Sequence, residues 1–160
     1  MKPDVLVMLK AMLPTPQGVG VFLSDGLKVI AIFVDPYVAA AITMFAQKVR
    51  KPRPLTHDLI AAILSGFGAR AAKVVINDLR GDTFFAKVYL LQESELGRGI
   101  VEIDARPSDS IAMAIQQKCP IYVSAAVWDR AEDASWALKQ AQERTGEDGP
   151  AAGGGQGEAG

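Results

Sequence analysis

The sequence of 160 residues predicts a single-domain α+β protein, with a mixed, largely antiparallel sheet of about seven strands and about four helices on one side of it. Strand-like runs follow one another across short turn signals, and helical patterns do not alternate strictly with them, which disfavours a doubly wound sheet. An apolar fraction of 49% with 22% charged residues is typical of a globular chain. A chain of about 150 residues buries roughly 68–70% of its unfolded surface, enough for a core without disulfides.

Apolar, often β-branched runs predict the strands. Turn signals at residues 14–18, 24–26 and 80–82 join neighbouring runs into hairpins. The predicted strands cover residues 5–12, 19–23, 28–34, 73–79, 83–91, 99–103 and 121–123.

Four helices are predicted, at residues 37–49, 56–66, 107–118 and 129–144. Asp35 is an N-cap followed by Pro36, and Pro107 opens the third helix in the same way. Thr56 is the expected N-cap of the second helix. Its expected buried stripe consists of Leu59, Ile60, Ile63, Leu64 and Phe67.

The composition changes towards the C-terminus. Residues 146–160 hold seven of the fifteen glycines and three of the eighteen acids, without Lys or Arg, which predicts a disordered, Gly-rich acidic tail. The domain is expected to cover residues 1–127, with a docked helix at 128–145. Without the tail, the chain has seventeen basic and fifteen acidic residues and a charge near +2.

Cys119 is the single cysteine, so the sequence predicts a buried free thiol and no internal disulfide. No run of eighteen apolar residues occurs, and the N-terminus does not read as a signal peptide. We therefore expect a cytoplasmic protein without a membrane partner.

Arg53, His57 and Asp58 lie together at a predicted helix N-terminus and include the single histidine. A helix N-terminus binds anions and favours neutral imidazole, which accepts protons or ligates metals. The alternative is structural, with Thr56 and Asp58 capping the helix and His57 filling a half-exposed position.

Asp104, Arg106 and Asp109 follow a strand and open a helix. Converging carboxylates suit Mg²⁺ or Mn²⁺, and a neighbouring arginine can hold a phosphate in bidentate fashion. The alternative is an Arg–Asp clamp that fixes the strand–helix corner. Both interpretations predict that Arg106 is buried.

Lys48, Arg50, Lys51 and Arg53 form a basic, proline-containing linker that either follows a nucleic-acid backbone or is a solvated loop. The glycine-rich loops of nucleotide-binding folds are absent, as is a Gly-x-Ser-x-Gly nucleophile motif, and one His with one Cys cannot form a typical zinc site.

Three motifs together resemble the bifunctional nuclease family, whose plant members degrade DNA and RNA. They are residues 53–59 (RPLTHDL), residues 74–79 with 83–86, and residues 103–114 (IDARPSDSIAMA), closed by residues 119–123. The resemblance covers roughly residues 5–127. It implies a self-associating α+β fold and metal-assisted phosphodiester hydrolysis, carried by Arg53, His57, Asp58, Asp104, Arg106 and Asp109.

One position departs from the family pattern. Val38 stands where relatives carry a glutamate on the helix, and Asp35 is the carboxylate that can substitute for it from three residues upstream.

Two functions follow as hypotheses. In the first, the protein is a Mg²⁺- or Mn²⁺-dependent nuclease acting on single-stranded or structured nucleic acid, with Asp104 and Asp109 as metal ligands. His57 and Asp58 then serve acid–base chemistry or ligation, and Arg53 and Arg106 stabilise phosphate charge. In the second, the protein is a non-catalytic, self-associating binding or scaffold protein whose motif residues are structural clamps.

Overall fold

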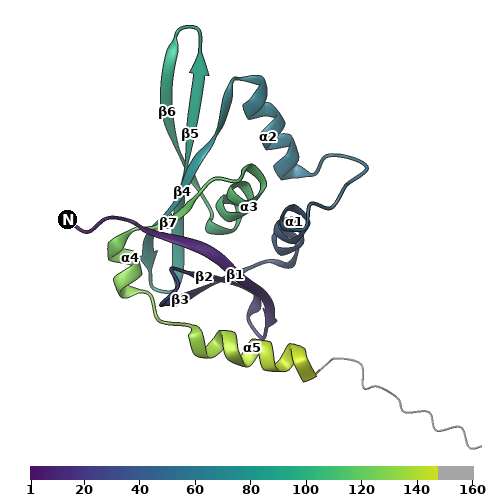
Figure 1. Ribbon diagram of the computed structural model, residues 1–160, viewed down its shortest axis with the longest axis vertical. Coiled ribbons are helices and arrows are strands. Elements are labelled where there is room, and N and C mark those ends of the chain that lie inside the picture. The colour runs from purple at the N-terminus through teal and green to yellow at the C-terminus, as the bar shows by residue number, and fades with distance from the viewer. Residues whose placement is uncertain (148–160) are drawn as a thin grey trace, which may run out of the picture.

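The computed structural model describes residues 1–147 and confirms the predicted α+β class, with seven strands in one mixed sheet and five helices in this part of the chain (Figure 1). The sheet order is β3-β2-β1-β7-β4-β5-β6, and the β4–β7 pair is parallel while the other pairs are antiparallel. The strands are β1 (Val5–Thr15), β2 (Gly18–Ser24), β3 (Val29–Val34), β4 (Ala69–Arg80), β5 (Thr83–Ser94), β6 (Gly97–Ala105) and β7 (Ile121–Val123). The helices are α1 (Pro36–Ala46), α2 (Thr56–Gly66), α3 (Pro107–Gln117), α4 (Ala125–Arg130) and α5 (Ser135–Glu147).

The main core lies between one face of the sheet and helices α1 and α3. Leu23, Ile30, Ile42 and Ile111 are fully buried in it. Because successive strand residues point to opposite faces, Phe22 lies on the other side of β2. There it packs with Val29 and Leu138 of α5 in a second cluster. The expectation that the helices lie on one side of the sheet was therefore wrong, because α5 packs on the opposite face against residues of β1, β2 and β3.

Helix α1 begins as predicted and ends earlier. The carboxylate of Asp35 accepts hydrogen bonds from the backbone N–H groups of Tyr37 and Val38, both at 3.0 Å. The helix stops at Ala46 and not at residue 49, and Lys48 has a left-handed φ of 54°. The basic residues that follow lie in the loop between α1 and α2.

Helix α2 differs from the prediction at its N-cap and in its buried face. Thr56 is its first residue and Leu55 its N-cap, whose backbone N–H donates to the Asp58 carboxylate at 2.8 Å. Ile60 and Leu64 pack on the core, but Leu59, Ile63 and Phe67 remain 56%, 50% and 73% exposed. Part of the apolar surface of α2 therefore has no partner within the described residues 1–147.

The predicted helix at residues 129–144 is two helices, α4 and α5. The break occurs where the chain meets β3, since Ala134 N–H donates to the Val29 carbonyl at 2.7 Å. Asp133 then caps α5 by accepting from the backbone N–H of Ser135 at 3.0 Å. Helix α5 includes Gly146 and Glu147, which the sequence places in the tail, and the rest of that tail lies outside the described residues.

Cys119 is free but only partly buried, and burial raises the pKa of its thiol. Within residues 1–147, none of the helices is long and apolar enough to cross a membrane.

Candidate functional site

The first turns of α2 and α3 bring together two residues that are 52 positions apart in the sequence. His57 lies on the first turn of α2 and is 7% exposed, with its ring edge-on to Phe45 of α1. Its Nε2 atom lies 3.2 Å from Oδ1 of Asp109, on the first turn of α3. When Nε2–H donates to this carboxylate, Nδ1 is the acceptor nitrogen of the neutral ring.

The same carboxylate also holds Arg106. The Arg106 Nε–H donates to Oδ2 of Asp109 at 2.8 Å. The bond and the nearby negative charge raise the pKa of Arg106, which stays a cation. One carboxylate thus orients both an imidazole and a guanidinium. We call His57, Arg106 and Asp109 the Asp109 cluster.

The expected burial of Arg106 was wrong, because its side chain is 66% exposed. Arg106 is the N-cap residue of α3 and bonds to Asp109 along one edge. A guanidinium carries five N–H donors in a planar fork, and Asp109 takes only the Nε–H here. The remaining donors can therefore bind an anion from solution.

Asp35 lies beside the cluster. Its Oδ2 atom is 4.0 Å from Nη1 of Arg106, while the same carboxylate caps α1. Val38 is 7% exposed and belongs to the main core. Asp35, the N-cap residue of α1, therefore supplies a carboxylate near Arg106.

Asp58 makes a different set of contacts from His57, its neighbour in sequence. Its carboxylate accepts hydrogen bonds from Lys51 at 3.0 Å, from Gln116 of α3 at 3.0 Å and from the Leu55 backbone. Burial acts to raise the pKa of Asp58, but these donors, led by Lys51, outweigh it and hold that pKa below its usual value. Asp58 thus links the basic loop, α2 and α3.

Besides Asp58, two predicted site residues lie apart from the cluster within residues 1–147. Arg53 is exposed in the loop before α2, and Asp104 is exposed on β6, opposite Lys87 of β5. Neither residue is among those bonded to His57, Arg106 or Asp109 in the described structure.

The family assignment rests on a comparison of the sequence with family models. Residues 21–135 match the model described as the bifunctional nuclease domain. The chain belongs to the bifunctional nuclease domain family. The matched region contains every candidate site residue and leaves out all of β1, the start of β2 and nearly all of α5.

Two relatives of this bifunctional nuclease domain come from two strains of Mycobacterium tuberculosis, and both are named as uncharacterised proteins. Each is 37% identical over 115 residues, which are 70% of this chain and 66% of the relative. The match therefore spans slightly less than two thirds of the length of these curated relatives.

The family resemblance implies a divalent metal, but the side chains of this bifunctional nuclease domain do not form a ready ligand group. Carboxylate oxygens are suitable donors for Mg²⁺ or Mn²⁺. Both Asp109 oxygens, however, already accept from Arg106 and His57. No three His, Cys, Asp or Glu side chains in residues 1–147 are grouped closely enough to hold an ion. The arrangement described does not fit a metal.

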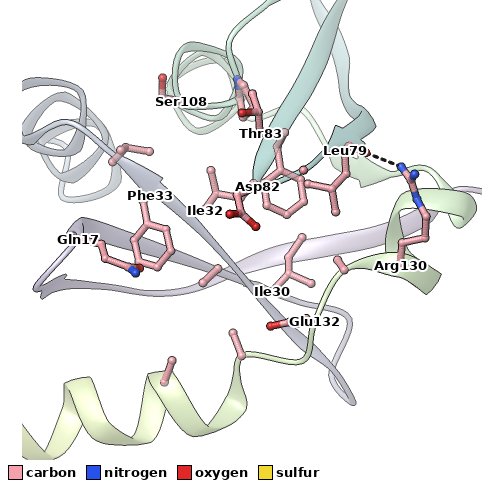
Figure 2. A pocket seen from close by; sticks show the side chains of 18 of the residues that line it. Gln17, Ile30, Ile32, Phe33, Leu79, Asp82, Thr83, Ser108, Arg130 and Glu132 are labelled. Carbon is pink, nitrogen blue, oxygen red and sulfur yellow. Dashed lines mark hydrogen bonds between the residues drawn. The ribbon is translucent and has the colours of Figure 1, made fainter.

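A groove of about 1000 Å³ begins beside the cluster, with Asp35 and Arg106 on its wall. Ser108, labelled in Figure 2, also lines it. We call it the β3 groove because all of residues 30–34 line it. Four further charged residues line it and were not predicted as site residues from the sequence: Asp82, Arg130, Glu132 and Asp133. They come from a hairpin turn, from the end of α4 and from the segment after α4, and no local motif marks their convergence on β3. His57 does not line this groove.

Proposed function

We propose that this bifunctional nuclease domain hydrolyses phosphodiester bonds of nucleic acids at the Asp109 cluster. The observation that carries the proposal is the shared carboxylate, which bonds the single histidine and an exposed arginine at once. A base for a water molecule and a cation for a phosphate are the groups that such a hydrolysis needs. Membership in the bifunctional nuclease domain family supports the same reaction.

Each residue then has a distinct role. The free N–H groups of Arg106 bind the non-bridging phosphate oxygens and stabilise the charge of the transition state. His57 takes a proton from the attacking water at Nδ1 and returns it to the leaving sugar oxygen as the phosphorus–oxygen bond breaks. Asp109 keeps the imidazole and guanidinium in place. Arg53, exposed in the basic loop, contacts phosphates farther along the strand.

The test is cleavage of fluorescently labelled single-stranded DNA and RNA by the purified full chain, with and without Mg²⁺ or Mn²⁺. Asp109→Asn is expected to lower the rate by about 10²-fold or more, because both partners lose their anchor. Asp129→Asn, which alters an exposed carboxylate on α4, is the matched control. Equal cleavage by Asp109→Asn and the wild type would remove the proposal.

The metal requirement is a separate arm of this assay. If Asp104 and Asp109 are ligands, as the sequence suggests, wild-type cleavage requires the ion and Asp104→Asn raises the Mn²⁺ concentration needed for half-maximal rate. If the wild type cleaves in the presence of a chelator and Asp104→Asn cleaves at the same rate, the Asp109 cluster catalyses the reaction without a metal ion. The two results therefore distinguish a hydrolysis that requires a metal ion from one that does not.

The second candidate function, a self-associating binding protein, is favoured by an exposed apolar surface on β6 and α2. Ile100, Val101 and Ile103 of β6 are 67%, 44% and 43% exposed, and β6 is the last strand of the sheet. Figure 1 shows the β5–β6 hairpin extending away from the body. A long exposed apolar edge strand is a template for another strand unless it is covered.

The sequence of β6 is suited to pairing with a second copy of itself. When two β6 strands pair in antiparallel fashion about a two-fold axis, Arg98 of one copy can lie opposite Glu102 or Asp104 of the other copy. The symmetry makes this contact occur twice. Opposite charges across strands stabilise a pair. Such a dimer would cover the apolar residues of the edge.

Light scattering of the full chain during size-exclusion chromatography tests this function. We expect a dimer or larger assembly for the wild type and dissociation by Ile103→Lys. Leu27→Lys, at a 93% exposed position in the β2–β3 turn, is the matched control and should leave the assembly intact. A monomeric wild type at every concentration would contradict self-association.

A further inference from the structure

The open edge of β3 carries backbone groups that are free to pair with another strand. Strand β3 is the first strand of the sheet order and pairs with β2 on one side. On its other side, the Val29 carbonyl accepts from the Ala134 N–H at 2.7 Å. Alternate residues of an antiparallel strand present their backbone groups to the same edge. Ala31 and Phe33 therefore present theirs to the same side as Val29.

The β3 groove runs along this edge. The turn between β4 and β5 and the start of α3 form one wall, and the chain from Arg130 to Ala137 forms the other (Figure 2). The Ala134 N–H bond to the Val29 carbonyl is one backbone contact of this kind at one end of the groove, and the Asp133 side chain accepts from the Val29 N–H at 3.4 Å. The groove, of about 1000 Å³, extends from there along β3.

The groove is acidic. Asp35, Asp82, Glu132 and Asp133 line it, and Figure 2 shows the carboxylates of Asp82 and Glu132 directed into it from opposite walls. Its two arginines already have acidic partners within residues 1–147. Arg106 bonds to Asp109 and lies near Asp35, and Arg130 lies 3.5 Å from Asp78. The carboxylates of Asp82 and Glu132 are therefore not neutralised by these arginines.

The groove also offers apolar contacts on both faces of the edge strand. Ile32 and Phe84 lie towards the β4–β5 hairpin, while Ala137 and the 65% exposed Trp136 of α5 lie on the other wall. An added strand presents alternate side chains to opposite faces. Apolar and cationic side chains are the ones that these walls can accept.

We infer that the β3 groove binds an extended peptide segment of a partner protein, which adds as a strand to β3 and carries apolar and basic side chains. The backbone of Ala31 and Phe33 supplies the hydrogen bonds, and the two walls select the side chains. Asp82 and Glu132 pair with Lys or Arg of the peptide. The inference does not depend on the proposed hydrolysis, because neither Asp82 nor Glu132 belongs to the Asp109 cluster.

The binding test uses the full chain and a fluorescein-labelled synthetic peptide of alternating lysine and valine residues, followed by fluorescence anisotropy at low salt. Saturable binding is expected, and a peptide of alternating glutamate and valine should bind at least about tenfold more weakly. Two N-methylated versions of the peptide test the backbone pairing, one with its odd-numbered and one with its even-numbered backbone nitrogens methylated. Only the version that has lost the N–H groups that pair with β3 should fail to bind.

Protein variants locate the site. Because the lysines of this alternating peptide all face one wall, one of the two variants Asp82→Asn and Glu132→Gln should weaken its binding about fivefold, as expected for one lost ion pair. Glu95→Gln, in the exposed β5–β6 turn, is the matched control and should not change the affinity. In ¹⁵N-labelled protein, the amide signals of Ala31 and Phe33 should shift on titration.

Several outcomes would overturn the inference. They are equal binding of the glutamate peptide, affinity unchanged in both Asp82→Asn and Glu132→Gln, amide shifts confined to β6, or shifts of the Ala31 and Phe33 amide signals when a single-stranded oligonucleotide is added without peptide. The last result would place nucleic acid in the groove. Peptide binding by a chain that cleaves no nucleic acid would support the inference while contradicting the proposed function.

Discussion

At the level of single residues, one carboxylate decides whether the motif can act as a site. Asp109 bonds His57 and Arg106 through different oxygens, so the imidazole and the guanidinium are fixed relative to each other. The sequence identified all three residues. It could not predict their contact, because that contact depends on how α2 packs against α3 and not on spacing along the chain.

Arg106→Ala separates a structural from a catalytic role. Since the side chain is 66% exposed, solvent screens its ion pairs and their loss should lower the melting temperature by only a few degrees. Cleavage should fall by about 10²-fold or more, since a phosphate-binding cation is lost. Calorimetry and the cleavage assay measure the two effects. A drop of more than about 10 °C with unchanged cleavage would make Arg106 a structural clamp.

Asp58 is expected to contribute to stability in a pH-dependent way. Its pKa is lower in the folded state than the ordinary value, because the hydrogen bonds led by Lys51 outweigh the opposing effect of burial. A lowered folded pKa gives stability that is complete above the unfolded pKa of about 3.9. That stability is lost as the pH falls through the folded pKa.

Asp58→Asn should therefore destabilise the protein by about 1–2 kcal/mol at pH 7 through weakened charge-assisted hydrogen bonds. The difference from wild type should shrink below about pH 4, where the wild-type carboxylate also protonates. Urea unfolding at several pH values measures this, with Asp129→Asn as the exposed control. A difference that stays constant down to pH 3 would show that the charge of Asp58 does not stabilise the fold.

At the level of elements, the junction between α2 and β4 depends on one glycine. Gly68 has a φ of +67°, and a Cβ atom at this position would lie 2.7 Å from the backbone oxygen of Glu93 on β5. Its own carbonyl accepts from the Glu93 N–H at 3.0 Å. The close backbone approach ties the end of α2 to the β5–β6 hairpin.

Gly68→Ala should cost at least about 1–2 kcal/mol, because it combines a left-handed conformation with a backbone clash. Gly66→Ala is the matched control, with no atom within 4 Å of the added Cβ, and should be neutral or stabilising by up to about 1 kcal/mol. Chemical denaturation compares them. Equal stability of the two variants would contradict this account, because it would mean that the backbone at the α2–β4 junction shifts without cost to accept a Cβ atom at position 68.

Local patterns predicted most of the elements, and the differences have local causes. The hairpins were recoverable because turn residues and neighbouring strands are adjacent in sequence. The apolar stripe of α2 was read as fully buried, but Leu59 and Ile63 face away from the core that Ile60 and Leu64 contact. When a helix carries apolar residues on more than one face, its sequence predicts that all of these faces are buried. The hydrophobic periodicity does not show which face lacks a packing partner.

At the level of the whole molecule, the sheet order and the second covered face could not be read from the sequence. Strand β7 lies between β1 and β4, parallel to β4, although it follows α3 in the chain. That insertion is a long-range pairing with no local signal. It unites the two antiparallel parts of the sheet and fixes the start of β1 beside β7. Helix α5, predicted from the sequence only as a docked C-terminal helix, buries Phe22 on the other face.

The whole-molecule arrangement places three surfaces at different points of the fold. The Asp109 cluster lies where α2 meets α3, the β3 groove runs along one edge of the sheet, and the apolar β6 strand forms the opposite edge. Arg106 belongs to the cluster and also lines the groove, so its variants are expected to affect both. Variants of His57, of Asp82 or Glu132, and of Ile103 each change one surface, and they test hydrolysis, peptide binding and self-association separately.

The cleavage rate of single-stranded RNA by His57→Gln, relative to wild type at equal folded fraction, tests the central claim most directly. Glutamine keeps a polar side chain but cannot exchange a proton near neutral pH. If His57 is the base of the Asp109 cluster, the rate falls by about 10²-fold or more. If His57→Gln cleaves at the wild-type rate, the cluster is not the catalytic site.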